Sequence, residues 1–442
     1  MLCISFFALF LFSFLLFCAI FFSPASLPSP TVPDKTTDSH ARLLTLNIFM
    51  RPPGVKNNWS DYKDDRLEYI MDYILPEYDI IAFQEAFAFA SRRKDRLIRR
   101  ARELGFNYHV ESPRHYPWEL AVDGGLLLIS RFPIRQSDTI EFPRGTHSDW
   151  LAIKGALHAL IELNPSRSLH VYTTHTQASY DLFNVINQGD TEIRLSQFAR
   201  LHQFMSDTAG NDGFPVMVMG DLNVDAATHG EGIAITQPSK ESSREYRMLM
   251  DVLRGTGIHG LTEKGDMSTA VFEHPWKLDL TDVIYDHYGY HPVTFGDYEM
   301  DDRGNLRPAE TVLTDSDQLM TVQNIDRMLW AGRSTPVQIV DPKVEKFMVK
   351  DNLNMDEERR ARTAFTQISG KFLTLTARRR GRNEILSFSR YVFQTWEVLI
   401  FFFFFFTRSL RFKLRHAIES IKSICKSHQR NQADYRSCYH YR

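Results

Sequence analysis

The sequence predicts an α/β fold, because apolar runs of strand length alternate with segments of helical periodicity between residues 41 and 370. Polar residues suited to metal or phosphate chemistry follow several of these apolar runs, at the point where a strand would end. The chain has 442 residues, of which 43% are hydrophobic and 13% aromatic. It can therefore bury a sizeable core, which excludes wholesale disorder.

Strands and helices are expected at definite places in this central region. Apolar runs indicate strands at residues 43–48, 79–85, 125–130, 156–163, 169–175 and 215–221. Helical spacing indicates three helices. The first covers residues 65–75 and ends before a proline, the second covers 91–105 and ends in a glycine, and the third, at 191–205, is amphipathic.

The N-terminal segment, residues 1–40, is expected to be a leader and linker. Residues 2–22 carry no charge and are long enough to span a bilayer as a helix. They exceed the usual apolar core of a cleaved signal peptide and follow no Lys or Arg. A cleaved signal and a signal-anchor both stay open, and both place the central region in the secretory pathway, secreted or anchored by this segment. The glycosylation sequon at Asn58-Trp59-Ser60 agrees with that compartment.

Charge and cysteine are distributed unevenly along the chain. The formal net charge is −2, but residues 371–442 carry 15 Lys and Arg against 4 Asp and Glu, or +11. Residues 1–370 carry 37 against 50, or −13. No cysteine lies between residues 19 and 424, so neither a disulfide framework nor a cysteine metal site holds the central region.

Five polar residues at predicted strand ends are candidate site residues: Asn47, Glu85, His175, Asp221 and Asn223. Taken singly, the Asn and Asp residues fit ordinary turns, the Glu a solvated strand end and the His a buried core histidine. Their recurrence at strand ends favours a site, since rigid scaffolds display reacting groups there. Mg²⁺ prefers oxygen ligands and keeps several waters, so one carboxylate and one amide can suffice. The absence of an HExxH motif argues against a zinc protease.

These residues carry a resemblance to the endonuclease/exonuclease/phosphatase superfamily, and within it to the Mg²⁺-dependent neutral sphingomyelinases of bacterial type. The resemblance covers about residues 41–370, and its THTQA and DGGLLLISRFPI segments favour the sphingomyelinase branch over the DNA-cutting members. The matching segments are LLTLNIF, FQEAF, DGGLLLISRFPI, DWLAIKGALHALI, THTQA, GDLNVD and NIDRML.

The resemblance implies a fold and an activity. The fold would be a DNase-like, four-layer α/β/β/α sandwich of two packed mixed sheets. The activity would be that of a Mg²⁺-dependent phosphodiesterase of the phospholipase C type, which cleaves sphingomyelin or a related choline phospholipid to ceramide and phosphocholine. The partner would be a phospholipid substrate at a membrane surface, with no nucleic acid, and we expect a monomer.

The resemblance also assigns roles to the matched residues. Glu85, with Asn47 beside it, would hold Mg²⁺ against a phosphate oxygen. Asp221 and Asn223 would orient water or stabilise the transition state at the scissile phosphate. The remaining two matched residues are His175, which would donate hydrogen bonds to developing negative charge, and Asp326, which would orient a catalytic histidine.

That histidine, the family's general base, is expected in a Ser-Asp-His segment after Asp326, and the sequence has no such segment there. The resemblance ends at Gly370, where the charge also changes sign. We hypothesise that residues 370–442, a basic tail, derive from a retained intron, and a cDNA that reads straight through Gly370 with no shorter product would count against this. A short membrane segment at 392–406 is the rival interpretation.

Asp286-His287-Tyr288-Gly289 resembles the missing segment, but it precedes Asp326. Its sequence context indicates a loop and strand outside the metal site.

Two other function classes stay open. One is a catalytically inactive isoform that binds metal and lipid headgroups. The other is a nuclease or phosphoinositide phosphatase on the same fold, against which the charge of −13 argues, because tight DNA binding needs Lys and Arg. Substrate choice would depend on loops such as residues 50–64 and 228–247.

Overall fold

The computed structural model describes residues 2–36, 40–55, 62–179, 188–229, 239–258, 272–296, 298–308, 321–334, 337–348 and 367–374. The chain divides into two compact units, residues 1–378 and 379–442, and the second lies outside the described residues. The sequon at residues 58–60 and the short apolar segment at 392–406 also lie outside them.

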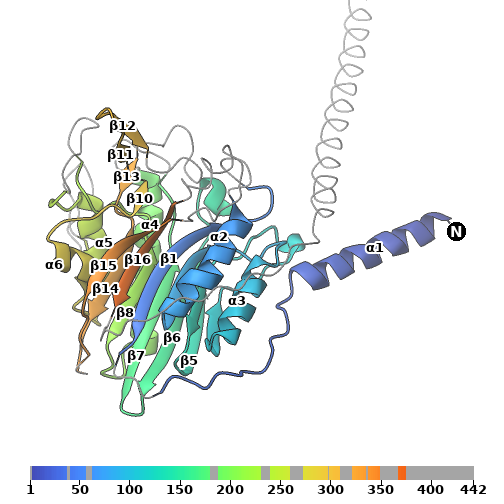
Figure 1. Cartoon of the computed structure of the whole chain (residues 1–442), viewed down its shortest axis with the longest axis horizontal. Helices are drawn as coiled ribbons and strands as arrows, with labels where there is room; N and C mark the ends of the chain where they lie inside the picture. The colour runs from blue at the N-terminus through green and yellow to red at the C-terminus, as the bar shows by residue number, and fades with distance from the viewer. Residues whose placement is uncertain are drawn as a thin grey trace, which may run out of the picture. The chain divides into compact units, whose positions relative to one another are not determined.

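Two six-stranded mixed sheets form the centre of the first unit (Figure 1). In the first sheet β1 and β2 are parallel and every other neighbouring pair is antiparallel. Its strands, in spatial order, are β15 (Pro342–Met348), β16 (Gln367–Thr374), β1 (Arg42–Met50), β2 (Ile80–Ala86), β4 (Leu127–Ser130) and β3 (Tyr108–Glu111). Strand β16 crosses residue 370, where the family resemblance ends.

In the second sheet β7 and β8 are parallel and the other pairs are antiparallel. Its order is β5 (Ile134–Glu141), β6 (Gly155–Asn164), β7 (Arg167–His175), β8 (Val216–Asp221), β14 (Asp326–Ala331) and β9 (Thr281–Asp282). Two small antiparallel pairs lie apart from both sheets. They are β10 (Phe295–Gly296) with β13 (Val322–Gln323), and β11 (Tyr298–Met300) with β12 (Leu306–Pro308).

Buried apolar side chains fill the space between the sheets. Because alternate residues of a strand point to opposite faces, each sheet has an inner and an outer set. The inner set joins the sheets in one cluster, with Leu43, Ile80 and Leu128 from the first sheet and Val171 and Met219 from the second. Fully burying such a side chain contributes about 1.5–3 kcal/mol, so this layer holds the two sheets face to face.

Helices cover the outer faces of both sheets. The outer set of the first sheet packs against α2 (Lys63–Tyr69), η1 (Ile70–Ile74), η2 (Leu75–Glu77) and α3 (Arg93–Glu103). The outer set of the second packs against α4 (Gln188–Ala209) and α5 (Arg244–Arg254). The layers therefore follow the order helix, sheet, sheet, helix, which confirms the predicted four-layer α/β/β/α sandwich.

The predicted strands and helices are all present, with ends that shift by a few residues. The expected glycine stop after α3 is Gly105, whose φ of +91° a residue with a side chain rarely adopts. One local prediction was wrong, because residues 283–288 form a short helix, α6 (Val283–Tyr288), in place of a loop. Asp282 begins this helix by accepting hydrogen bonds from the backbone N–H groups of Ile284 and Tyr285, and Gly289 ends it at φ +70°.

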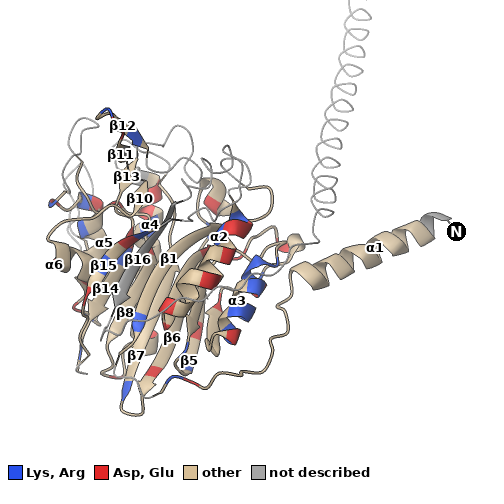
Figure 2. Ribbon diagram, viewed as in Figure 1, with Lys and Arg blue, Asp and Glu red and all other residues tan. Residues whose placement is uncertain are grey.

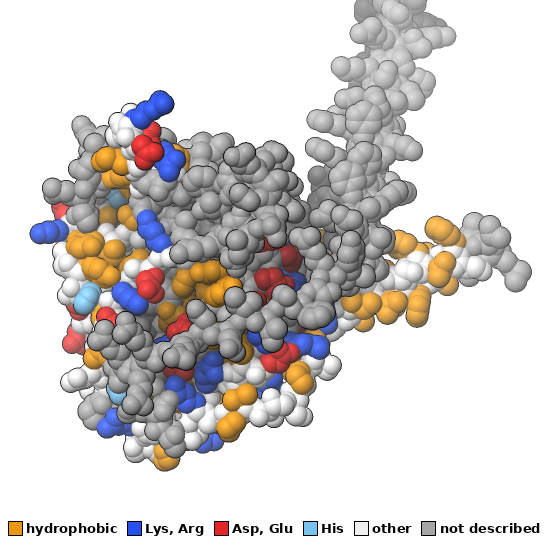
Figure 3. Space-filling model, viewed as in Figure 1, with side chains coloured by type: hydrophobic (Ala, Val, Ile, Leu, Met, Phe, Trp, Pro, Cys, Tyr) orange, Lys and Arg blue, Asp and Glu red, His pale blue; other side chains and the backbone are white. Residues whose placement is uncertain are grey.

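The leader forms α1 (Leu2–Phe21), and many of its large apolar side chains are exposed (Figure 3). Within the described residues, no helix combines the length and apolar character needed to cross a membrane. The linker after α1 packs on the central region. Phe22 is buried against the rings of Phe89 and Tyr116, and Lys35 pairs with Asp79 at 2.9 Å.

Helices α2 and α3 present opposite charges to each other (Figure 2). Arg93 pairs with Asp64 at 3.0 Å, and Arg96 pairs with Glu68. Each exposed pair of this kind contributes at most about 1 kcal/mol. The apolar layers therefore stabilise the fold far more than these surface pairs do.

A buried polar layer joins the sheets near the strand ends. Gln84 on β2 is fully buried, and its Nε2 donates to Thr45 Oγ1 at 3.1 Å and to Thr173 Oγ1 at 3.0 Å. Thr45 lies on β1 and Thr173 on β7, so one amide connects both sheets.

Replacing Gln84 with Leu leaves two buried hydroxyls without this donor, and we expect a loss of about 1–3 kcal/mol of unfolding free energy. Urea unfolding followed by tryptophan fluorescence measures it. Gln136→Leu, on the exposed edge strand β5, is the matched control and should change stability by less than about 0.5 kcal/mol. Equal stability of the two variants would contradict a bridging role for Gln84.

Candidate active site

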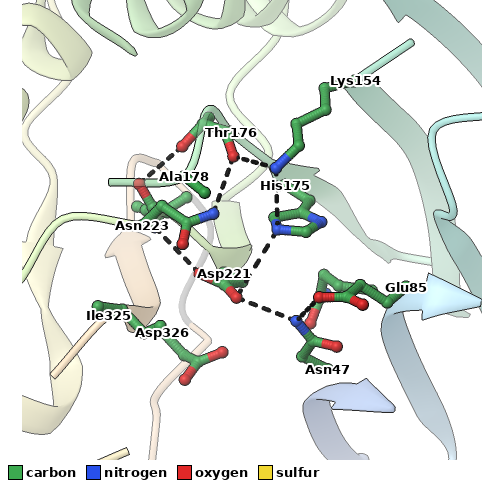
Figure 4. Close-up of polar contacts among 12 residues, drawn as sticks. Asn47, Glu85, Lys154, His175, Thr176, Ala178, Asp221, Asn223, Ile325 and Asp326 are labelled. Carbon is green, nitrogen blue, oxygen red and sulfur yellow. Dashed lines mark hydrogen bonds and ion pairs between the residues drawn. The ribbon is translucent and has the colours of Figure 1, made fainter. Parts of the chain in front are cut away.

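Strand pairing brings the predicted site residues of the second sheet to one edge. His175 ends β7 and lies opposite Asp221, the last residue of parallel β8. Asp326 begins β14 and lies opposite Asp221 from the other side. Asn47 and Glu85 lie near the ends of the parallel strands β1 and β2 in the facing sheet. The ends of four parallel-paired strands therefore meet where the two sheets face each other (Figure 4).

Asn47 links the two sheets at this edge. Its Nδ2 donates to Glu85 Oε1 at 3.0 Å and to Asp221 Oδ2 at 3.1 Å, while its Oδ1 accepts from the backbone N–H of Phe49 at 3.1 Å. The register of β1 and β2 shifts between Asn47 and Met50, an irregularity that re-aims side chains at the end of a strand. The Phe49 contact fixes the amide with its nitrogen toward the two carboxylates.

Two site residues adopt backbone conformations that few non-glycine residues favour. Glu85 has φ +53° and Asn223 has φ +49°. Asparagine tolerates this region, but glutamate does so at a cost of about 1–3 kcal/mol. Asn223 is held by its N–H to Asp221 Oδ1 at 3.0 Å and by its Nδ2 to the Thr176 carbonyl at 2.8 Å. In this backbone conformation, the Glu85 carboxylate accepts the hydrogen bond from Asn47.

Asp221 has a strongly perturbed acidity. Burial, and then the nearby charge of Asp326, raises the pKa of Asp221 to about 7. The hydrogen bonds from Asn47 and from the Asn223 N–H oppose that rise but do not cancel it. The carboxyl group can therefore hold or release a proton near neutral pH, which suits a group that handles an attacking water.

The structure adds two residues that the sequence analysis did not single out, Lys154 and Asp149. Lys154 is buried, and its Nζ lies 3.2 Å from His175 Nε2, 2.6 Å from the Thr176 carbonyl and 3.1 Å from Asp149 Oδ2. Asp149 also accepts the N–H of Ala178 at 2.7 Å. The sequence position of Lys154 could have indicated a role for it. It directly precedes a long apolar strand, where an unpaired lysine would be costly to bury.

His175 has its contacts on one side of its ring. Its Nε2 faces Lys154 and lies 3.8 Å from Asp221 Oδ2, too far for a hydrogen bond. Its Nδ1 is buried and has no hydrogen-bond partner in the described part of the chain. Burial, and then the charge of Lys154, holds the pKa of His175 well below its usual range. The ring is therefore neutral at neutral pH.

The alternative histidine, His287, is placed elsewhere. It is exposed on α6, where its ring packs edge-on against Tyr288, whose hydroxyl accepts the N–H of Val344. None of the contacts described for the site residues involves it. The structure thus agrees with the expectation that His287 lies outside the site.

The chemistry of the donor set suits a hard cation held by few protein ligands. Among the described residues, no group of three or more His, Cys, Asp or Glu side chains could hold a metal ion. Glu85 offers a half-buried carboxylate at the strand edge, and Mg²⁺ commonly binds one or two carboxylates together with waters and substrate phosphate.

Comparison with known proteins identifies the family of this chain. Residues 44–338 match the model of the Endonuclease/Exonuclease/phosphatase family, and the chain belongs to that family. A sphingomyelinase of Dictyostelium discoideum is 25% identical over 409 residues, covering 67% of this chain and 86% of the relative. A phospholipase C of Staphylococcus aureus is 27% identical over 204 residues, covering 44% of this chain and 60% of the relative.

A solved structure, a beta hairpin deletion mutant of the Staphylococcus aureus beta toxin, covers 69% of this chain and 91% of its own at 19% identity and a TM-score of 0.45. The family and sequence matches confirm the predicted resemblance to sphingomyelinases of bacterial type. They also confirm the prediction of a sphingomyelin phosphodiesterase-like hydrolase.

The raised pKa of Asp221 predicts how stability varies with pH. Folding favours its protonated form, so that stabilisation is present below the unfolded pKa of about 4 and is lost as pH rises through about 7. Asp221→Asn should flatten the fall in unfolding free energy between pH 5 and pH 8, measured by urea unfolding in EDTA. Asp207→Asn, on the exposed face of α4, should leave the dependence of the unfolding free energy on pH unchanged. An unchanged slope in Asp221→Asn would contradict the account.

Proposed function

We propose that this chain represents a Mg²⁺-dependent phosphodiesterase of the phospholipase C type, which releases phosphocholine from sphingomyelin or a related choline phospholipid. The observation that carries the proposal is the Asn47 amide that joins Glu85 of one sheet to Asp221 of the other. It places a carboxylate able to hold a cation beside a carboxyl group able to exchange a proton. Metal-assisted hydrolysis of a phosphodiester uses both kinds of group.

Each residue of the site has a part in the proposed reaction. Glu85, oriented by Asn47, would hold Mg²⁺, which supplies charge neutralisation at a phosphate oxygen when bound. Asp221, with its raised pKa, would orient the attacking water through a hydrogen bond. Asn223 is fixed beside Asp221 and would orient the same water. The neutral His175 would donate a hydrogen bond to the negative charge that develops on the phosphate.

The general base is the part of the proposed site that this sequence lacks. In the resemblance, Asp326 orients a histidine of a Ser-Asp-His segment, and the residues after Gly370 provide none. Loss of a general base typically costs about 10²–10⁴-fold in rate. We therefore propose that the chain is strongly impaired as it stands and that residues 370–442 replace the missing segment. Binding of metal and headgroup would persist in such a chain.

Exposed apolar residues beside the site favour a membrane surface as the place of action. Trp118, Leu120, Trp150 and Leu151 are 48–68% exposed, and we call them the apolar patch. Arg144 donates hydrogen bonds to the carbonyls of both Leu120 and Trp150, which brings the two segments of the patch together. Trp150 directly follows Asp149, which pairs with Lys154 of the site. Tryptophan is enriched at membrane–water interfaces. The patch supports action at a lipid surface, and the apolar α1 agrees with a protein of the secretory pathway, secreted or membrane-associated. We propose that it acts as a monomer.

The proposed activity is tested by phosphocholine release from sphingomyelin vesicles. A chain in which residues 370–442 are replaced by a Ser-Asp-His segment should release phosphocholine about 10²–10⁴-fold faster than the chain as it stands. EDTA should abolish this release and Mg²⁺ restore it. Glu85→Gln should lower it at least ~100-fold, since metal stabilisation is worth several kcal/mol.

Glu103→Gln, an exposed change on α3, serves as the matched control and should leave the rate unchanged. Measuring plasmid nicking by the same protein distinguishes the nuclease alternative from the proposed phospholipase C type activity. The chain in which a Ser-Asp-His segment replaces residues 370–442 is called the repaired chain. If the repaired chain releases no phosphocholine, the proposal is wrong. If it nicks DNA and releases no phosphocholine, the nuclease alternative is favoured.

The apolar patch predicts a dependence on the lipid surface. Replacing both Trp118 and Trp150 with Ser in the repaired chain should lower phosphocholine release from vesicles about tenfold, because interfacial apolar contact is lost. Hydrolysis of a short-chain soluble substrate should stay within about twofold, since neither indole belongs to the site. Equal losses on both substrates would point to damage to the site and away from a role at the surface.

A further inference from the structure

Lys154 has a complete and specific set of hydrogen-bond acceptors. An ammonium group has three N–H donors and no acceptor. Its three neighbours are the Thr176 carbonyl at 2.6 Å, Asp149 Oδ2 at 3.1 Å and His175 Nε2 at 3.2 Å. The first two can only accept, so the third proton of Lys154 points at the ring nitrogen of His175. Lys154 is 5% exposed, which leaves little room for water to replace any of these acceptors.

This arrangement determines which nitrogen of His175 carries the proton. Since Nε2 faces an N–H donor, it must present a lone pair, and the proton of the neutral ring then sits on Nδ1. A doubly protonated ring would place a second N–H against the ammonium. The low pKa of His175 agrees with a neutral ring. Figure 4 shows the contacts of His175 gathered at one ring nitrogen, and the buried Nδ1 has no partner among the described residues.

We propose that Lys154 is a positioning residue, which holds His175 as the neutral tautomer with its proton on Nδ1 and so reserves that N–H for an oxygen of the substrate phosphate. Asp149 supports this role by neutralising the ammonium and by accepting the Ala178 N–H at 2.7 Å. The inference rests on the proposed function and deepens it, because it names the residue that fixes the tautomer His175 needs for its proposed donor role. A preorganised donor of this kind stabilises the charge of a transition state.

Removing Lys154 has a definite consequence for the tautomer. Without the ammonium, the nearest charged acceptor beside Nε2 is Asp221 Oδ2 at 3.8 Å. The proton of His175 should therefore move to Nε2, where it can approach that carboxylate, and Nδ1 should lose its N–H. The donor intended for the phosphate disappears while the ring stays in place.

The test is nitrogen NMR of the full chain labelled with ¹⁵N-histidine, with His175→Gln used to assign the ring signals. The native chain should show a protonated Nδ1 and an unprotonated Nε2 for His175, and Lys154→Met should reverse this pattern. Lys63→Met is the matched control, because Lys63 is equally buried on α2 but outside the site, and it should leave the His175 signals unchanged. In the repaired chain, Lys154→Met should lower kcat about 10²–10³-fold with KM within about threefold.

A native His175 protonated on Nε2 overturns the proposal, and this outcome needs no variant to fold. Lys154→Met with an unchanged tautomer also overturns it, as does a reversed tautomer with an unchanged kcat. Asp149→Asn is a second variant that loosens Lys154 without removing it, and it should give a mixture of the two tautomers. If the repaired native chain releases no phosphocholine, the proposed function fails, while the NMR pattern still decides the role of Lys154.

Discussion

The site depends on the two hydrogen bonds that the side-chain amide of Asn47 donates across the gap between the sheets. An amide nitrogen has two N–H groups, and here each has its own carboxylate, Glu85 on one sheet and Asp221 on the other. Without that donor, two carboxylates would face one another at the buried edge, where like charges repel strongly. The backbone N–H of Phe49 fixes the amide in the orientation that makes both bonds possible.

The rest of the fold holds these groups at the right depth and spacing. The register of β7, β8 and β14 places His175, Asp221 and Asp326 side by side at one level of the second sheet. The Gln84 layer joins both sheets just beneath, and the inner apolar cluster holds the two sheets face to face. The strained backbone at Glu85 is tolerated because this packing over-determines its position. The packed sheets therefore provide the stability of the fold, and the residues at the strand ends form the candidate site.

Much of the fold could be predicted from the sequence, because the inner strands are apolar runs that end in polar residues. Asn47, Glu85, His175 and Asp221 were predicted for that reason, and the structure brings them together. Strand β5 escaped prediction because it is an exposed edge strand of mostly polar residues. Lys154 escaped because its role arises from the pairing of β6 with β7, which places it beside His175, and no local pattern encodes that pairing. The α6 helix depended on a side-chain cap that looked like ordinary turn chemistry.

The central claim is that the strand-end cluster binds a hard cation through Glu85 in the orientation that Asn47 provides. Calorimetric titration of the metal-free chain with Mg²⁺ tests it most directly, because it requires neither a substrate nor a Ser-Asp-His segment. The account predicts one Mg²⁺ per chain, no measurable binding in Glu85→Gln, and binding weakened about 10–100-fold in Asn47→Ala, the usual effect of losing a residue that orients a ligand. Mg²⁺ binding to Glu85→Gln as tight as to the native chain would contradict the account.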